Sequence, residues 1–539
     1  MKLGSFAKIS GIAALSALIL AGCGQSSATK SGKNELTWVQ SSNMPTMDLS
    51  KATDQISGQT LNGSNEGLLR MAENNEVVPG VAKSYTISKD GKTWTFNLRH
   101  SKWSDGTAVT AKDFVYSWRR TLDPKTASQY AYIFDHVANA TKVNEGKLPL
   151  SKLGVKADGN YKLVVTLARP QSYFKYLVAQ SYFFPQKESV VKKDGGKYGT
   201  TSKDMIYNGP FKLTGWTGTN DTWSLVKNKH YWNAKKVTLD KIKFQVAKDP
   251  ATALNQYQSG KVQVTPLVGQ QVKQYKTNKD FVLRKNAATF YLEMNQKKYA
   301  FFRNQNIRKA ISLTINRQQL TDKVLADGSV PAKGLVAANM SLHNGKDFAD
   351  QAEVKGATSQ NLVEAKKLWA KGLKETGKKS VSFNLMADDT EAGKRTTEFV
   401  QSQLTKLPGF KVTNQNLPYK TRLQRSADGQ FDMVVTAWIA DFPDPITFLS
   451  LLTSDNSYNN GKWQNAQYDK LVADAEGKDA NNANKRWDDM VKAEKVLAND
   501  EGIVPLYQQA TPQLVKSGIK GIQYFPTAPI WDWSKVTVK

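Results

Sequence analysis

Cysteine and histidine are scarce in this chain. Its 539 residues include a single cysteine, Cys23, so no intramolecular disulfide can form. The four histidines lie far apart in the sequence, and none has a second ligand-type residue at helical spacing; they are His100, His136, His230 and His343. A zinc site of the HExxH kind is therefore excluded, and no metal is expected.

Sequence signatures of catalysis are also missing. The chain has neither a G-x-S-x-G elbow nor a G-x-G-x-x-G fingerprint. Gly372 to Lys378 follows the phosphate-loop pattern, but Lys379 stands where that loop needs a Ser or Thr for magnesium. The preceding segment, Leu362 to Leu373, is predicted to be a helix rather than a strand. We therefore expect a protein that is not an enzyme and needs no cofactor.

Acidic residues are too few to balance the basic ones. There are 75 Lys and Arg against 47 Asp and Glu, a net charge of +28. The positive charges are spread along the chain without zinc-finger spacing, an RNP-type motif or a long basic run, so no nucleic-acid partner is expected. Anionic envelope polymers or lipid headgroups could still be attracted. A surface adhesin with a basic exterior therefore stays an alternative.

The first 22 residues predict a secretory leader. Lys2 and Lys8 precede the apolar run from Ile9 to Ala21, which is too short to span a bilayer. The run ends in Leu-Ala-Gly before Cys23, which resembles the lipobox of bacterial lipoproteins. Two acyl chains on Cys23 would anchor the protein, with residues 23–34 as a flexible tether. We expect it on the outer face of the cell membrane, in an envelope of the Gram-positive type.

The chain from Glu35 onward predicts a globular body of mixed α/β or α+β class. At about 505 residues it exceeds what one hydrophobic core usually holds, so two or three sub-domains are expected. Residues alternate between apolar and polar from Tyr85 to Leu98 around an Asp-Gly turn, which predicts a β-hairpin. Thr110 to Arg120 is predicted to be a helix, with Thr110 as its cap and Asp113 at its positive end.

A second stretch carries a conspicuous acidic residue. The apolar, β-branched run from Met433 to Ile439 predicts a buried strand, and two prolines follow it. Asp444 and Pro445 suit the first turn of a helix from Ile446 to Leu452. Asp441 is not needed as that cap. It is therefore expected to be a carboxylate presented at the end of the strand, beside Trp438.

Several long motifs follow one another along the chain. They are Glu66–Leu69, Pro79–Ser84, Asp90–Arg99, Trp103–Gly106, Thr110–Phe114, Leu122–Tyr130, Asn208–Phe211, Tyr291–Asn295, Arg308–Ile311 and Trp438–Pro445. Together they span effectively all of the chain after the tether. In this order they resemble the oligopeptide-binding lipoproteins of ABC importers, within family 5 of the bacterial extracellular solute-binding proteins.

This resemblance implies the two-lobed periplasmic-binding-protein type II fold. Two hinge strands would join the lobes, which close over a ligand, and an extra sub-domain would extend the first lobe. The implied first lobe is 35–78, 206–290 and 507–539, the extra sub-domain 79–205, and the second lobe 291–506. The hinge crossings are expected near Asn295 and Val504.

The resemblance also implies a peptide site. Asp441 would receive the α-amino group of the peptide, because an enclosed ammonium is costly unless it is paired. Short strands on the two lobes would bind the peptide backbone; their residues are Glu66, Gly67 and Leu68, and Ala437, Trp438 and Ile439. Three tyrosines would line the cleft, although ordinary core packing is the alternative for each; they are Tyr130, Tyr419 and Tyr507.

One position departs from the family pattern. Val435 stands where enteric relatives have an arginine that helps to hold the carboxylate of a short peptide. Arg422 and Arg425 lie nearby but not in register. How the C-terminus of a peptide is held therefore stays open.

The function implied by the resemblance is capture of oligopeptides outside the membrane. A monomeric receptor would deliver them to the permease of an ABC importer, and separate cytoplasmic subunits would use ATP. The same fold could instead bind a dipeptide, a signalling peptide, haem or a metal complex. An adhesin and an envelope enzyme are the other classes considered.

Overall fold

The computed structural model describes residues 34–73 and 76–539 of the chain. The predicted leader, the lipidation site at Cys23 and nearly all of the predicted tether lie outside these residues. None of the helices in the described ranges is both long enough and apolar enough to cross a membrane.

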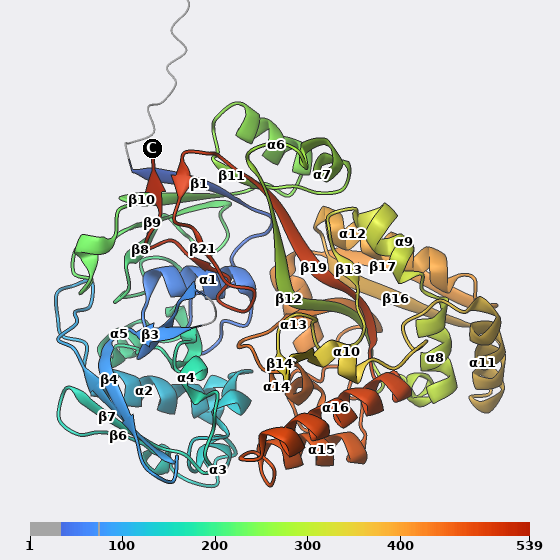
Figure 1. Cartoon of the computed structure of the whole chain (residues 1–539), viewed down its shortest axis with the longest axis horizontal. Coiled ribbons are helices and arrows are strands. Elements are labelled where there is room, and N and C mark those ends of the chain that lie inside the picture. The colour runs from blue at the N-terminus through green and yellow to red at the C-terminus, as the bar shows by residue number, and fades with distance from the viewer. Residues whose placement is uncertain (1–33, 74–75) are drawn as a thin grey trace, which may run out of the picture.

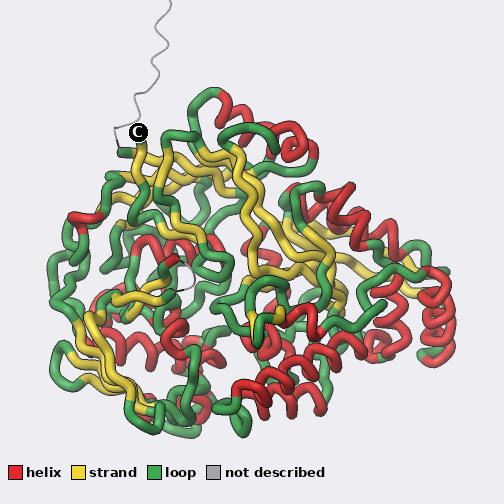
Figure 2. The backbone as a smooth tube through the Cα atoms, viewed as in Figure 1, coloured by secondary structure: helices red, strands yellow, loops and turns green. Residues whose placement is uncertain are grey.

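Strands and helices alternate along the chain, as the mixed class predicts (Figures 1 and 2). The described helices are α1 (Gln55–Ser64), α2 (Ala111–Leu122), α3 (Ala140–Asn144), α4 (Phe174–Leu177), α5 (Glu188–Asp194), α6 (Pro250–Gln258), α7 (Gln270–Tyr275), α8 (Gln305–Thr314), α9 (Arg317–Gln319), α10 (Phe348–Ala352), α11 (Leu362–Glu375), α12 (Glu391–Leu404), α13 (Tyr419–Ala427), α14 (Ile446–Leu449), α15 (Ala466–Glu476) and α16 (Ala483–Asp500). Below, the first lobe, the sub-domain and the second lobe denote the three predicted ranges given above.

One large sheet runs through both lobes. Its strands, in spatial order, are β17 (Phe410–Leu417), β16 (Val381–Asp388), β18 (Met433–Ile439), β12 (Phe281–Met294), β19 (Val504–Val515), β11 (Val264–Pro266), β1 (Glu35–Gln40), β10 (Lys241–Val246), β9 (Thr222–Lys227) and β8 (Phe211–Thr214), with β13 (Val330–Pro331) also paired to β19. The strand predicted from Met433 to Ile439 is confirmed as β18. Other short strands form two-stranded pairs outside this sheet: β2 (Leu69–Met71) with β3 (Val77–Pro79), β14 (Leu342–His343) with β15 (Lys346–Asp347), β20 (Ile519–Lys520) with β23 (Thr537–Val538), and β21 (Gln523–Tyr524) with β22 (Trp531–Asp532).

The sub-domain has its own sheet of β4 (Ala82–Ile87), β5 (Thr93–Leu98), β7 (Lys162–Thr166) and β6 (Val155–Ala157). The first two strands form the predicted hairpin, and Gly91 supplies the positive φ of 71° that its turn requires. The predicted helix is α2, where the carboxylate of Asp113 accepts the Thr110 N–H at 2.7 Å.

Two long strands connect the lobes. In Figure 1, β12 and β19 lie side by side through the middle of the molecule. The C-terminal part of β19 pairs with β11 of the first lobe, whereas β12 pairs with β18 of the second lobe from Ala288 onward. Their mutual register shifts between Lys285 and Thr289, as at a β-bulge. This shift lies six to ten residues before Asn295, and its counterpart on β19, between Gln508 and Ala510, lies four to six residues beyond Val504.

Three large apolar clusters hold the parts together. One fills the first lobe around Trp38 and Phe244, and one fills the second lobe around Phe302 and Leu385. The third is shared, because buried residues of the sub-domain and of the second lobe belong to the same cluster. The sub-domain and the second lobe are therefore packed against each other, and Ile439, at the C-terminal end of β18, packs against the cluster of the first lobe.

Candidate functional site

Asp441 lies where β18 leaves the sheet. Its backbone N–H donates to Oγ1 of Thr447 at 3.0 Å, and the side-chain amide of Gln180, from the sub-domain, donates to its carbonyl at 2.6 Å. Asp444 caps the next helix, as predicted, by accepting the Ile446 N–H at 3.0 Å; this helix is α14, continued by a 3-10 turn over Ser450–Leu452. The backbone of Asp441 is thus fixed from both sides of the cleft.

The carboxylate of Asp441 is buried and only half satisfied. The residue is 3% exposed. Oδ1 accepts the hydroxyl of Tyr130 at 3.3 Å, whereas Oδ2 has no hydrogen-bond partner among the described residues. No Lys, Arg or His in the described ranges forms an ion pair with it. Burial consequently raises the pKa of Asp441 to about 7, although hydrogen bonds lower it in part.

Aromatic side chains enclose this carboxylate. Tyr130 stacks on Tyr182 with ring centroids 4.4 Å apart, and Tyr458 stands edge-on at 5.6 Å from Tyr130 and 4.8 Å from Trp438. The hydroxyls of Tyr182 and Tyr458 and the indole nitrogen of Trp438 are also buried without a hydrogen bond of ordinary geometry among the residues described, although the Tyr182 hydroxyl is close enough to the Asp441 carboxylate to lower its pKa. The sequence analysis missed Tyr182 and Tyr458, because no local pattern links these positions to Asp441.

The end of β18 offers an unpaired backbone edge. One edge of the strand pairs with β12 along its whole length. On the other edge, β16 pairs only with Met433 and Val434. Within the described structure, Ala437 to Ile439 therefore has a strand partner on one side only, and Ile439 packs against the core of the first lobe. This is where the sequence predicts peptide backbone binding.

The segment from Glu66 to Leu68 is more strongly committed to its own lobe. The side chain of Asn208 bonds both backbone groups of Glu66, at 3.0 and 2.9 Å. The carbonyls of Gly67 and Leu68 accept N–H groups of residues 80–82. The carboxylate of Glu66 accepts from Tyr231 and Trp232, and burial raises its pKa. The N–H groups of Gly67 and Leu68 remain as the backbone donors that this segment could offer to a ligand.

Gly67 connects this segment with Asp441. A Cβ at Gly67 would lie 2.5 Å from the ring of Phe184 and 2.9 Å from the carbonyl of Val178. The same segment, 178–184, carries Gln180, which bonds Asp441. The two predicted backbone-binding segments thus flank one loop of the sub-domain, and the structure brings them into one region.

The three predicted cleft tyrosines lie in different surroundings. Tyr130 is beside Asp441. Tyr419 begins α13, and its hydroxyl lies against Asp54 and the backbone of Gln55 in the first lobe, so it is at the contact between lobes. Tyr507 stacks on Phe290, 4.6 Å away, within the core of the second lobe, so the structure does not bring it beside Asp441.

The two arginines near β18 are hydrogen-bonded to different kinds of partner. Val435 lies in the core of the second lobe. Arg422 donates to the carboxylate of Asp388 at 2.8 and 3.2 Å and to Thr436 at 3.2 Å. Arg425 donates to Gln415 at 3.2 Å. The guanidinium of Arg422 is therefore neutralised by Asp388, whereas the hydrogen bond of Arg425 to a neutral amide leaves its charge without an acidic partner among the described residues.

A separate cavity of about 710 Å³ lies in the second lobe, beside the hinge strands. Its wall includes Thr289, Arg317, Lys333 and Gln508. It contains none of the predicted site residues.

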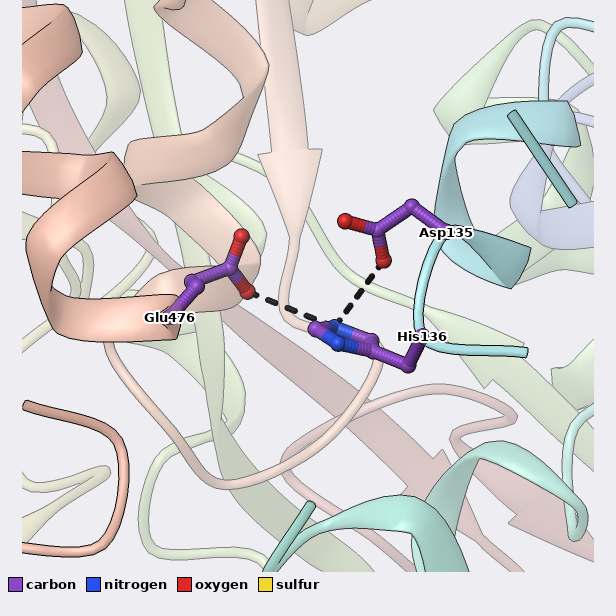
Figure 3. Close-up of side chains that lie close together, drawn as sticks. All are labelled: Asp135, His136 and Glu476. Carbon is purple, nitrogen blue, oxygen red and sulfur yellow. Dashed lines mark ion pairs between the residues drawn. The ribbon is translucent and has the colours of Figure 1, made fainter. Parts of the chain in front are cut away.

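The structure also brings His136 close to two carboxylates that no sequence motif links to it. Asp135 and His136 of the sub-domain meet Glu476 of the second lobe, and one ligand-type atom from each lies within 4.8 Å of the others (Figure 3). No local pattern could predict this cluster, because 340 residues separate His136 from Glu476.

Comparisons with known proteins agree on one family. The family described as bacterial extracellular solute-binding proteins, family 5 Middle, matches residues 76–460. A protein named dipeptide-binding protein, from Lactococcus lactis subsp. cremoris (strain MG1363), is 36% identical over 556 residues, which cover 100% of both chains. The solved structure of Listeria monocytogenes OppA bound to peptide is 40% identical and superposes with a TM-score of 0.90, covering 94% of this chain and 99% of that one.

A further pair of structures indicates the arrangement of the lobes. The Escherichia coli murein tripeptide binding protein MppA, 30% identical, superposes with a TM-score of 0.86 over 94% of this chain and 99% of its own. The unliganded open form of MppA reaches only 0.62 over 94% and 98%. The lobes described here are therefore arranged as in the peptide-bound relative and not as in the open form. The predicted two-lobed fold is confirmed.

Proposed function

The chain belongs to family 5 of the bacterial extracellular solute-binding proteins, and on this basis we propose that it binds oligopeptides around Asp441 for an ABC importer. Members of this family bind substrates for ABC transporters and are not enzymes, so the prediction of a protein without catalytic activity is confirmed.

The cluster of unsatisfied polar atoms around Asp441 carries the proposal. Buried polar atoms in folded proteins nearly always have hydrogen-bond partners. Here four of them gather within one aromatic enclosure: Oδ2 of Asp441, the hydroxyls of Tyr182 and Tyr458, and Nε1 of Trp438. A polar ligand that enters between the lobes would satisfy them by donating to the carboxylate and by accepting from the indole N–H, which can only donate.

A peptide α-ammonium fits this enclosure best. It carries a positive charge and several donors, whereas the carboxylate of Asp441 lacks a cationic partner among the described residues. Aromatic faces of Tyr130 and Trp438 would favour the same cation. Removing one partner of a buried ion pair typically costs about 3–5 kcal/mol. The free amino terminus is therefore expected to be required for tight binding.

The backbone of the peptide would be held by strand addition. The open edge at Ala437–Ile439 supplies backbone donors and acceptors on the second lobe, and the N–H groups of Gly67 and Leu68 supply donors on the first. Every peptide presents the same backbone groups. Recognition through them tolerates different side chains, which general peptide uptake needs.

The length of the bound peptide depends on how its C-terminus is held. Because Asp388 already neutralises Arg422, this arginine, which is bonded to Thr436 of β18, is not available to fix a carboxylate at one distance from Asp441. This favours ligands of variable length. The full-length resemblance to a protein named for dipeptides makes a dipeptide the alternative ligand.

The proposal extends to the cell surface. The leader and Cys23 support a lipid anchor on the outer face of the membrane, with residues 24–34 as the tether. The closed protein, a monomer, would deliver its peptide to a permease whose separate subunits use ATP. Its lobes would be 35–78, 206–290 and 507–539, and 291–506, with 79–205 as the extra sub-domain.

Calorimetric titration of the leaderless protein, stripped of ligand, tests the proposal. Peptides of increasing length, starting from dipeptides, are compared with their N-acetylated forms, and Asp441→Asn is compared with Asp488→Asn, an exposed control in α16. We expect acetylation and Asp441→Asn each to weaken binding by roughly 10²–10³-fold. Equal binding of free and acetylated peptides would remove the amine role of Asp441, and no binding by either would reject a peptide ligand.

A further inference from the structure

A polar cluster joins the sub-domain to the second lobe (Figure 3). Glu476 is the last residue of α15 in the second lobe. Asp135 and His136 follow the 3-10 turn Ala131–Phe134 of the sub-domain, and Arg169 and Tyr173 precede α4. Contacts between Glu476 and these four residues therefore cross the cleft.

Glu476 receives all of its donors from the opposite side. The hydroxyl of Tyr173 donates to Oε1 at 2.6 Å, and Nε2 of His136 lies 3.5 Å from the same oxygen. Nη2 of Arg169 lies 4.0 Å from Oε2 and 3.0 Å from Oδ2 of Asp135. Nε2 of His136 lies 3.1 Å from Oδ1 of Asp135. Arg169 and His136 thus bridge one carboxylate from each side of the cleft.

Within its own lobe, Glu476 is placed unfavourably. The C-terminus of a helix is its negative end, and a carboxylate there is destabilised. The last turn of α15 contains no basic residue. Burial alone would raise the pKa of Glu476, but His136, Tyr173 and Arg169 lower it to about 2. The stabilising partners of this charge are therefore the groups across the cleft.

The cluster is continuous with the ligand site. The ring of Tyr173 stacks on Phe442, the neighbour of Asp441, with centroids 4.6 Å apart. The guanidinium of Arg486 lies over the Tyr173 ring, 5.6 Å from its centroid. It also donates to both carboxylate oxygens of Asp444 at 2.8 Å. One short stretch of chain, Asp441 to Asp444, therefore contacts both the amine enclosure and the cross-cleft cluster.

We propose that Glu476, with Tyr173, His136 and Arg169, forms a latch that stabilises the closed lobes without touching the ligand. This inference rests on the proposed function, because closure retains a peptide. Apparent affinity falls with the closed fraction, so loss of the latch weakens binding of every peptide by the same factor. Loss of Asp441 instead weakens only peptides with a free amine.

A metal site is the competing interpretation of the same residues. One histidine and two carboxylates at these separations could bind a divalent ion. However, the hydroxyl of Tyr173 already bridges Nε2 of His136, at 2.8 Å, and Oε1 of Glu476. Arg169 supplies positive charge to both carboxylates. The donors present thus complete the cluster as a hydrogen-bonded ion pair.

Dissociation of fluorescently labelled peptides, followed by stopped flow, tests the latch. We compare Glu476→Gln and Tyr173→Phe with Glu398→Gln, an exposed glutamate of the second lobe. We expect Glu476→Gln to raise the dissociation rate about tenfold, as for a lost charged hydrogen bond, and by the same factor for peptides of different sequence. The association rate stays unchanged. In the Glu476→Gln background, Tyr173→Phe adds little, because both changes remove one contact.

The outcomes separate the two proposals. If the wild-type protein binds no peptide, the proposed function fails. If it binds peptide and Glu476→Gln dissociates at the rate of the Glu398→Gln control, only the latch is rejected. Slower dissociation on adding zinc chloride, abolished by His136→Gln, would replace the latch with a metal site. Melting curves check folding, and Tyr173→Phe, which keeps the stacked ring, carries the test if Glu476→Gln does not fold.

Discussion

The pH dependence of peptide affinity follows from the burial of Asp441. In the closed arrangement of the lobes described here, burial raises the pKa of this carboxyl to about 7. An ammonium beside it would favour the ionised form and lower that pKa. Binding therefore releases a proton over the range between the two pKa values, and affinity increases with pH up to about 7. Above this range, loss of the proton on the α-amino group, at pH about 8, weakens binding again.

The loss of peptide affinity below pH about 7 can be calculated from the pKa of Asp441. If the pKa of Asp441 is about 7 without ligand and well below 6 with it, affinity at pH about 6 is roughly tenfold lower than its maximum, or ~1.4 kcal/mol. Calorimetry in buffers of different ionisation enthalpy measures the proton release directly. The affinity of the Asp441→Asn variant should not fall below pH about 7, and its binding should release no proton.

One result would refute this reasoning. A wild-type affinity that stays constant from about pH 5 to pH 7, with no release of protons, would mean that Asp441 is already ionised before the peptide arrives. The carboxylate would then be solvated in the ligand-free protein, and desolvation would not set its response. The exposed variant Asp488→Asn should reproduce the wild-type profile whichever profile is found.

Three further predictions concern single side chains. Tyr130→Phe removes the one hydrogen bond to Oδ1 of Asp441, so calorimetry should show an affinity loss of about 1 kcal/mol for free-amine peptides and none for acetylated ones. Glu293 is buried and its pKa is raised to about 7, so its ionisation destabilises the folded protein as pH rises from its unfolded pKa through 7; Glu293→Gln should therefore raise the melting temperature at pH about 8 but not at pH about 4, and an equal effect at both would contradict this. Gly67→Ala places a methyl group against Phe184 and should lower stability by about 1–3 kcal/mol in urea unfolding; a neutral effect would mean that the Phe184 ring moves freely.

The segment from Asp441 to Asp444 shows how binding and closure can share residues. Asp441 faces the aromatic enclosure, Phe442 stacks on Tyr173 of the sub-domain, and Asp444 binds Arg486. Pro443 within the segment and Pro445 directly after it stiffen the backbone and fix these directions relative to each other. A ligand that engages Asp441 would therefore favour the position in which Phe442 meets Tyr173. The latch variants measure that coupling.

Local patterns in the sequence were sufficient for several elements. The hairpin of β4 and β5 follows from alternating residues around an Asp-Gly turn. The helix α2 begins directly after Thr110, the residue predicted as its cap. The strand β18 and the cap at Asp444 depend on neighbours within a few residues. Motifs in a fixed order were also sufficient to identify the family and its two-lobed fold. Such features are determined by residues that are close in the chain.

The surroundings of Asp441 and Glu476 were decided by tertiary structure alone. The sequence places a carboxylate at the end of β18, but it cannot show that Tyr182 and Tyr458 enclose it or that no cation contacts it among the described residues. It likewise cannot show that Tyr507 packs on Phe290 in a core. Tyr182 is 259 residues from Asp441 and Tyr507 is 217 residues from Phe290, so these contacts join distant segments of the chain. They depend on how the two lobes close, because burial, charge pairing and pKa are set by neighbours in space and not in sequence.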